Sequence, residues 1–294
     1  MNCHHRAAHN AGGRPCRGFT LVELVITLML FGVMSVTLVI FLRPAMETYL
    51  TSRTRAQLVA QADHAVRRML NDVRLAVPNS LRSPADQCVE MVPTLGGGRY
   101  RIANDTVNAG AAAVDPGTST TSFDVLSPLA TLPSAGDWVV VDNQNAGDVY
   151  SGTNRSAVTA VSTPAAALGR HRLAINAMQF PLGYDGGRFN LVSNAQQAVF
   201  YVCSNTGTAL DGQGNAPGQL VRLKNYGFNA TMPAACPAVT GGDVLATGVR
   251  SCRFVYTPNQ GATQQSGFIA VQLELTRNSE TTSLVFGAHV ANMP

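Results

Sequence analysis

The chain has 294 residues, of which 46% are hydrophobic and only 13% charged, and its formal net charge is +4. This composition excludes a disordered, highly charged chain, because there is enough apolar surface to form a core and little charge to keep it solvated. The basic excess lies at the N-terminus: once Arg6, Arg14 and Arg17 are set aside, 18 basic side chains face 17 acidic ones. The remainder is too nearly neutral to indicate a nucleic-acid partner.

Residues 1–18 form a short basic leader that ends in Gly18. It lacks the apolar segment of 7–15 residues that a secretory signal peptide carries before its cut site. The apolar segment instead follows the glycine, from Phe19 to Leu42, with Glu23 as its only formal charge. As a helix, the uncharged part from Leu24 onward spans about 28 Å, close to the hydrocarbon thickness of a bilayer. We therefore expect a transmembrane helix over residues 19–42.

Glu23 is unusual in an apolar helix, since placing a lone carboxylate at the centre of a bilayer costs on the order of 3 kcal/mol. A residue retained at such a cost is expected to have a function. The junction Gly18-Phe19-Thr20-Leu21-Val22-Glu23 resembles the processing site of type IV prepilins and pseudopilins, and Gly32 matches a glycine common in pilin stems. The resemblance implies that a prepilin peptidase cuts after Gly18 and methylates the new N-terminal Phe19, and that Glu23 serves assembly. The alternative is an uncleaved signal anchor.

Residues 43–78 are predicted to continue as an amphipathic stem helix. Pro44 removes one backbone donor, so a bend is expected there. The apolar residues that recur at helical spacing are Leu58, Ala62, Val66, Leu70, Val73 and Val77. They predict one face packed on a globular body, with Asp63 and Asp72 mostly off that face. Pro78 ends the predicted helix, which runs from Phe19 to Val77.

Residues 79–294 are rich in turn residues and in short β-branched or alternating runs, which predicts an antiparallel β-sheet body. The strands are expected near residues 88–92, 99–102, 122–126, 138–141, 158–161, 188–192, 198–203, 220–223, 251–256, 268–276 and 284–290. The clearest has Ile269, Val271, Leu273 and Leu275 on one face. The fold class is thus α+β, a type IV pilin-like helix packed on a sheet. The body is either one compact domain or a sheet with a large insertion.

Four cysteines lie in this body: Cys88, Cys203, Cys236 and Cys252. An even number without metal-ligand spacing predicts disulfides and an oxidising compartment, which places the body in the periplasm. Four free thiols are the alternative. Of the three possible pairings, we take Cys203 with Cys236, which closes a modest loop, and Cys88 with Cys252.

No catalytic, cofactor or metal site is predicted. His64, His171 and His289 are scattered, with His171 in an expected loop, and no hydrolase, zincin or P-loop motif is present. Asn143, Asn145, Gly147 and Asp148 cluster in a predicted turn. A calcium loop is a second interpretation of that cluster, although its spacing is not that of an EF-hand.

Arg99 and Arg101 follow three glycines and flank Tyr100. They indicate either a patch for an anionic partner or, as we prefer, a hairpin whose outward positions are basic.

Looser similarities extend through the body. Residues 78–80, 88–93, 97–101, 199–203, 252–256 and 289–294 resemble minor pilins of the mannose-sensitive haemagglutinin (MSHA) pilus of the MshO type, whereas residues 104–181 match nothing. The resemblance implies a non-enzymatic, single-pass inner-membrane protein with a periplasmic body, which joins a pilus and contacts major and minor pilins through its N-terminal helix. The alternatives are a type II secretion minor pseudopilin, an adhesive module, weakly supported because Trp138 is the single tryptophan, and an anchored periplasmic enzyme.

Overall fold

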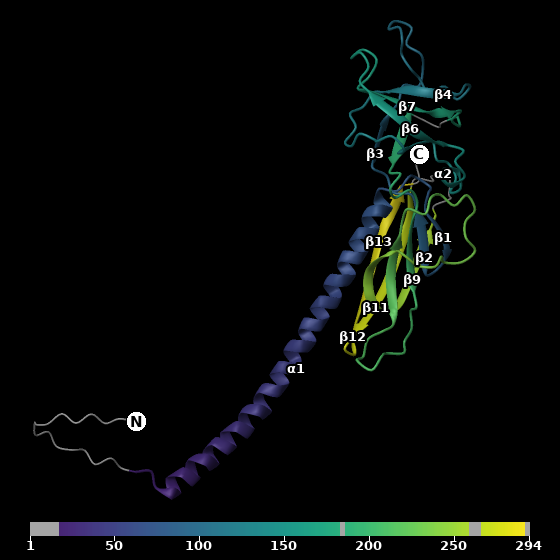
Figure 1. Ribbon diagram of the computed structural model, residues 1–294. Coiled ribbons are helices and arrows are strands. Elements are labelled where there is room, and N and C mark those ends of the chain that lie inside the picture. The colour runs from purple at the N-terminus through teal and green to yellow at the C-terminus, as the bar shows by residue number, and fades with distance from the viewer. Residues whose placement is uncertain (1–17, 183–185, 259–265, 292–294) are drawn as a thin grey trace, which may run out of the picture. The chain divides into compact units, whose positions relative to one another are not determined.

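The structure is a computed structural model that describes residues 18–182, 186–258 and 266–291. Residues 1–17 of the leader and the last three residues lie outside this range. The chain divides into two compact units, one up to Ser52 and one from Arg53 onward. Helix α1, Leu21–Arg74, runs from the first unit into the second (Figure 1). The predicted long helix is therefore confirmed, and Pro44 lies inside it.

Helix α1 ends three residues earlier than predicted, because the following residues pair with another segment. The backbone N–H of Val77 donates to the carbonyl of Val92 at 2.8 Å, and that of Thr94 donates to the carbonyl of Leu75 at 2.8 Å. A bridge between Ala76 and Pro93 continues this pairing. Extended pairing next to the helix thus ends α1 before Pro78 is reached.

The second half of α1 packs on a seven-stranded antiparallel sheet. In spatial order its strands are β1 (Arg82–Ala85), β2 (Cys88–Met91), β9 (Val199–Ser204), β10 (Gly218–Leu223), β11 (Asp243–Thr257), β12 (Ser266–Arg277) and β13 (Glu280–Ala291). The predicted helix face is buried in this core, from Leu58 to Val73, together with the inward face of β12 from Ile269 to Leu275. The α+β class, a long helix packed on antiparallel strands, is confirmed.

A second sheet, of six strands, occupies the sequence between β2 and β9. Its spatial order is β3 (Gly96–Arg99), β8 (Arg188–Val192), β5 (Trp138–Val141), β6 (Arg155–Ser162), β7 (His171–Met178) and β4 (Thr120–Val125). The short helix α2, Asp148–Ser151, connects β5 to β6. The body thus contains a second sheet inserted between β2 and β9, and it belongs to the single compact unit that begins at Arg53.

The two edge strands of this inserted sheet are joined to each other. The N–H of Arg101 donates to the carbonyl of Asp124 at 2.9 Å, and the N–H of Leu126 donates to the carbonyl of Arg99 at 2.8 Å. The sheet therefore closes into a small barrel, which we call the inserted barrel. Its interior is filled by side chains, including the edge-to-face pair Phe123 and Phe189 at 5.4 Å between ring centroids.

Three sequence predictions fail in the inserted barrel and beside it. His171 was expected in a loop but begins β7, whose run of Ala, Asn and Arg around Leu173 and Ile175 gives a weak strand signal. Strand β3 lies over Gly96–Arg99 rather than 99–102. Strand β1 was not predicted, because its sequence Arg-Ser-Pro-Ala has no β-branched residue.

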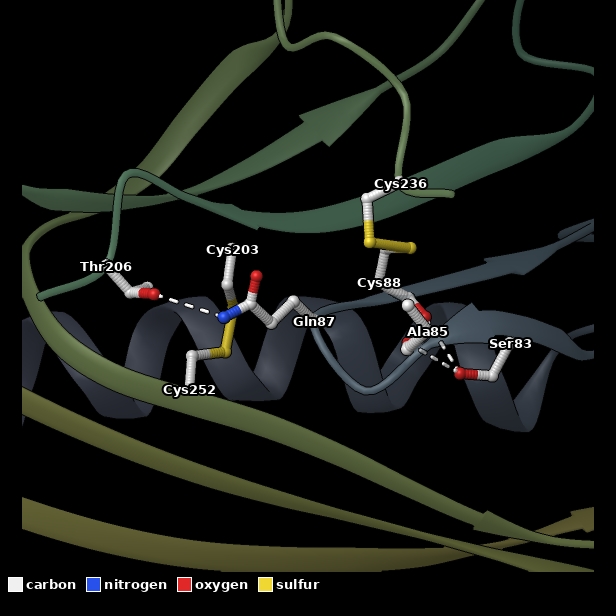
Figure 2. Close-up of a disulfide and its surroundings, with 8 residues drawn as sticks. All are labelled: Ser83, Ala85, Gln87, Cys88, Cys203, Thr206, Cys236 and Cys252. Atoms are coloured by element: carbon white, nitrogen blue, oxygen red, sulfur yellow. Dashed lines mark hydrogen bonds between the residues drawn. A yellow bond between two sulfur atoms is a disulfide. The ribbon is translucent and has the colours of Figure 1, made fainter. Parts of the chain in front are cut away.

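The four cysteines of the body form two disulfides, Cys88–Cys236 and Cys203–Cys252, with Cα–Cα distances of 5.6 and 6.1 Å (Figure 2). The prediction of disulfides is confirmed, but the predicted pairing is wrong. Cys88 lies directly opposite Val202 in the β2–β9 ladder. Since neighbouring residues of a strand point to opposite faces, Cys203 faces away from Cys88 and from its partner Cys236.

The two disulfides consequently serve opposite faces of the seven-stranded sheet. Cys203 and Cys252 belong to the core beneath α1. Cys88 belongs to a separate cluster with Phe200, against which Cys236 packs, so this bond holds the β10–β11 loop over the other face. Sequence spacing could not reveal this assignment, because it depends on strand order.

Candidate functional site

The candidate site is the start of α1, where the residues of the processing signature lie. The N–H of Glu23 donates to Thr20 Oγ1 at 3.3 Å, and the N–H of Leu24 donates to the Thr20 carbonyl at 3.1 Å. Thr20 therefore caps the helix, and Thr20 with Glu23 has the Ser/Thr-x-x-Glu spacing of a capping box. Gly18 and Phe19 precede the cap and lie outside the helix, which leaves the peptide bond between them in extended, accessible chain.

No described residue packs against Gly18 in a way that requires glycine. A Cβ atom placed there would meet nothing within 4 Å, and Phe19 is 75% exposed. The same holds for Gly32 in the helix, where an added Cβ also meets nothing. A requirement for glycine at position 18 must therefore come from a molecule that approaches the chain.

The first unit exposes its apolar side chains along the whole helix. Phe31 is 68% and Phe41 79% exposed, and no residue of α1 before Leu58 is buried. Hydroxyls within the apolar segment bond to the backbone of their own helix: Thr27 donates to the Leu24 carbonyl at 2.9 Å and Ser35 to the Phe31 carbonyl at 2.7 Å. A helix with an apolar surface whose hydroxyls bond to its own backbone is suited to lipid. It is long and apolar enough to span a membrane.

Glu23 is the single formal charge from Gly18 to Leu42, and it is exposed in the first turn of α1. A carboxylate in that turn is stabilised by the positive end of the helix dipole. Among the ion pairs formed by the described residues, none includes Glu23, whereas Arg43 and Glu47 pair at 3.4 Å further along the helix. The Glu23 carboxylate thus has no cationic partner within residues 18–182, 186–258 and 266–291.

The polar cluster after β5 is engaged by the protein itself. Asn143 is buried, its Oδ1 accepts from the N–H of Val149 at 2.8 Å, and its Nδ2 donates to the carbonyl of Pro78 at 2.7 Å. Asp148 accepts from the N–H of Asn145 at 2.9 Å. These bonds shape the turn before α2. Within the ranges that the structure describes, no three His, Cys, Asp or Glu side chains lie close enough together to hold a metal ion.

A buried charge cluster between α1 and the sheet escaped sequence reasoning. Asp72 was placed off the buried helix face, yet it is only 4% exposed and Arg222 of β10 only 2%. Arg222 Nη2 lies 2.8 Å from Asp72 Oδ2, and the hydroxyl of Tyr201 donates to the same oxygen at 2.7 Å. Burial beside the Asp72 carboxylate raises the pKa of Tyr201 above its usual range. Asp72 also lies 3.9 Å from Arg68 one turn earlier, but its buried partners Tyr201 and Arg222 lie over a hundred residues away, so no local signal could reveal them.

A second buried cluster anchors the β10–β11 loop on the opposite face. Glu90 is fully buried, accepts from Arg82 Nε, and accepts from the hydroxyl of Tyr226 at 2.7 Å. Arg82 also donates to the carbonyl of Asn229 at 2.7 Å and lies over the ring of Tyr150. Burial raises the pKa of Glu90, while its hydrogen bonds to Arg82 and Tyr226 oppose that rise.

Comparison with known proteins agrees with the geometry at the N-terminus. The family described as the prokaryotic N-terminal methylation motif matches residues 13–39, which contain the predicted cut site, the Thr20 cap and Glu23. No curated protein and no solved structure matches the chain. A methylation motif on an exposed apolar helix, followed by a helix packed on antiparallel strands, defines a membrane-anchored protein with a type IV pilin-like fold. More particularly, these features support a type IV pilin or pseudopilin, a class processed by prepilin peptidase.

Proposed function

We propose that the chain is a minor type IV pilin of an MSHA-like pilus, which helps to initiate or cap the filament. The observation that carries the proposal is the exposed start of α1, where Gly18, Phe19 and Glu23 keep the spacing of the processing signature on a helix with an apolar surface. The protein acts as a structural subunit. Its helix is anchored in the inner membrane before assembly, and its disulfide-bonded body lies in the periplasm.

Cleavage after Gly18 would create a positive α-amine on Phe19, four residues before Glu23. Within a filament, the carboxylate meets the amine of a neighbouring subunit in a water-poor environment. An unpaired charge there is costly, so subunits dock stably only in the stagger that pairs the two charges. The lack of an internal ion pair for Glu23 among the described residues is consistent with this role.

The size of the body supports a minor rather than a repeating subunit. The inserted barrel lies between β2 and β9 and adds a second sheet to the head. Copies in a helical filament pack their heads side by side, so a head enlarged by an inserted sheet needs more room at every position. A subunit used once, at the tip or at initiation, is not subject to that constraint.

The test replaces Glu23 by Ala and uses Glu47→Ala, an exposed acidic residue of the same helix, as the matched control. We expect the Glu23→Ala chain to be cleaved and membrane-inserted, yet to fail to co-purify with other pilins and to reduce the number of filaments. The Glu47→Ala chain should do neither. Normal filament number and normal co-purification for Glu23→Ala would overturn the assembly role.

The genes beside this one separate the pilus from a type II secretion system. Genes for other pilins, a prepilin peptidase and a pilus assembly ATPase support the proposal. Genes for a secretion outer-membrane channel and its pseudopilins would instead make the chain a pseudopilin.

A further inference from the structure

The inserted barrel carries three exposed arginines on its outer face: Arg99 in β3, Arg188 in β8, and Arg170 immediately before β7. Arg99 of β3 lies directly opposite Arg188 of β8 in the ladder. On the other side of β3, the carbonyl of Arg99 accepts a hydrogen bond from the N–H of Leu126. The carbonyl of Val125, the residue before Leu126, accepts from the N–H of Arg170 at 2.7 Å. With about 4.8 Å between neighbouring strands, Arg188, Arg99, Leu126 and Arg170 form one transverse row. We call it the arginine row.

The arginine row has no acidic partner among the described residues. The ion pairs of the inserted barrel that the described residues form do not involve Arg99, Arg170 or Arg188. All three residues are exposed. Arginines directly opposite each other in a sheet repel, so Arg99 and Arg188 are unfavourable neighbours unless an anion lies between them. The arrangement stands out in a body whose basic and acidic side chains are nearly equal in number.

The next row of the same face shows how the barrel neutralises arginines for structural purposes. Arg101 and Arg172 both flank Asp124, which is fully buried, and Arg172 Nε lies 2.7 Å from its carboxylate. Arg101 also lies 3.4 Å from Asp105 and donates to the carbonyl of Leu168. Of the two arginines singled out in the sequence, Arg101 is therefore structural and Arg99 is available.

Two hollows flank the row, one on each side of the Leu126–Ser127 segment. The first, of about 400 Å³, is lined by Arg99 and Arg188 together with Ser127 and Asn190. The second, of about 520 Å³, is lined by Arg170, Thr163 and residues 166–169. Each hollow combines guanidinium groups with hydroxyl or amide groups, and each is of the size of small-ligand sites.

We propose that the arginine row is a binding site for an acidic oligosaccharide, whose uronate carboxylates bind to the guanidinium groups while its hydroxyls bond to Ser127, Asn190 and Thr163. Guanidinium is the side chain that matches a carboxylate with two parallel hydrogen bonds. Single-stranded nucleic acid fits less well, because neither hollow has an exposed aromatic side chain for base stacking: Phe189, which lines the first, is 2% exposed. The inference is independent of the proposed place in a filament.

The test measures binding of tetragalacturonate to the full-length chain in detergent micelles by calorimetry. The methyl ester of tetragalacturonate is the uncharged probe, and polyphosphate and duplex DNA are the other polyanions. Three variants are compared with the unaltered chain: Arg99→Gln/Arg188→Gln, Arg170→Gln, and the control Arg250→Gln/Arg253→Gln, which removes the same charge from β11. Circular dichroism and non-reducing gels verify that each variant is folded with both disulfides.

We expect tetragalacturonate to bind more tightly than its ester, polyphosphate and DNA. The Arg99→Gln/Arg188→Gln variant should lose about tenfold or more in affinity, Arg170→Gln should lose less, and the β11 control should stay within about twofold. The proposal is overturned if the unaltered chain does not bind tetragalacturonate, if the ester binds equally, or if the β11 control loses as much as the row variant. Equal or tighter binding of DNA or polyphosphate would replace the glycan assignment with a general polyanion surface.

Discussion

Asp72 links α1 to the seven-stranded sheet, and its replacement by Ala should be among the most destabilising single changes in the body. The change leaves Arg222, 2% exposed, without its carboxylate and removes the acceptor of the Tyr201 hydroxyl. Breaking a buried ion pair on one side costs about 3–5 kcal/mol. With a urea dependence of about 2–3 kcal/mol per molar, the unfolding midpoint should fall by roughly 1–2 M.

The assay is pulse proteolysis of the full-length chain in detergent across a urea series, with Asp63→Ala as the control. Asp63 pairs with Arg67 on the exposed side of the same helix at 2.6 Å, and such a solvent-screened surface pair contributes little to stability. A third variant, Asp72→Leu/Arg222→Met, removes both charges and should recover most of the loss. If Asp72→Ala shifts the midpoint no more than Asp63→Ala does, the buried pair is not what ties the helix to the sheet.

Three further outcomes are expected. Gly18→Val should leave a precursor that still carries residues 1–18. The described residues leave room for the new side chain, so the expected block is a clash with the active site of the peptidase. A mature N-terminus at Phe19 in that variant would contradict this. Peptide mapping without reduction should find Cys88 joined to Cys236, and a double Ser variant of this pair should lose roughly 2–4 kcal/mol of unfolding free energy; finding Cys88 joined elsewhere would refute the placement of the β10–β11 loop. The pKa of Asp105 should be about 2, lowered by hydrogen bonds from Asn108 and Val107, so its contribution to loop order is complete above pH 4 and is lost as the pH falls toward 2; an NMR titration midpoint near the ordinary value would show that the loop is not held this way.

The sequence allowed the helix and much of the sheet to be predicted because both depend on local periodicity. Leu58 and Val73 repeat with the helix, and Ile269 to Leu275 alternate along one strand, so the faces they bury follow from spacing alone. Asp72 could not be placed in this way. A carboxylate near the edge of an apolar stripe is exposed or buried according to whether a distant arginine meets it, and Arg222 lies 150 residues further along the chain.

The failures at the cysteines and in the inserted barrel have the same physical origin. Val202 pairs with Cys88, so its neighbour Cys203 points to the opposite face of the sheet. This register depends on how two strands pair and cannot be found from one strand alone. The weak strand at His171 is held by β4 and β6 on its two sides, not by its own propensity. The signature at Gly18 to Glu23 could be recognised because its residues are adjacent in sequence.

The position of the inserted barrel has a consequence for how this protein can change. Strands β2 and β9 are direct neighbours, and Met91 lies opposite Val199 in their ladder. The chain thus leaves the sheet and returns to it across a gap of about 5 Å, which a two-residue turn could close. The barrel between these two residues is an insertion that can be enlarged or exchanged without breaking the β2–β9 ladder, provided that Val92 and Thr94 keep their pairing with the residues after α1. Selection on what the barrel touches is therefore separated from selection on how the helix is processed and anchored.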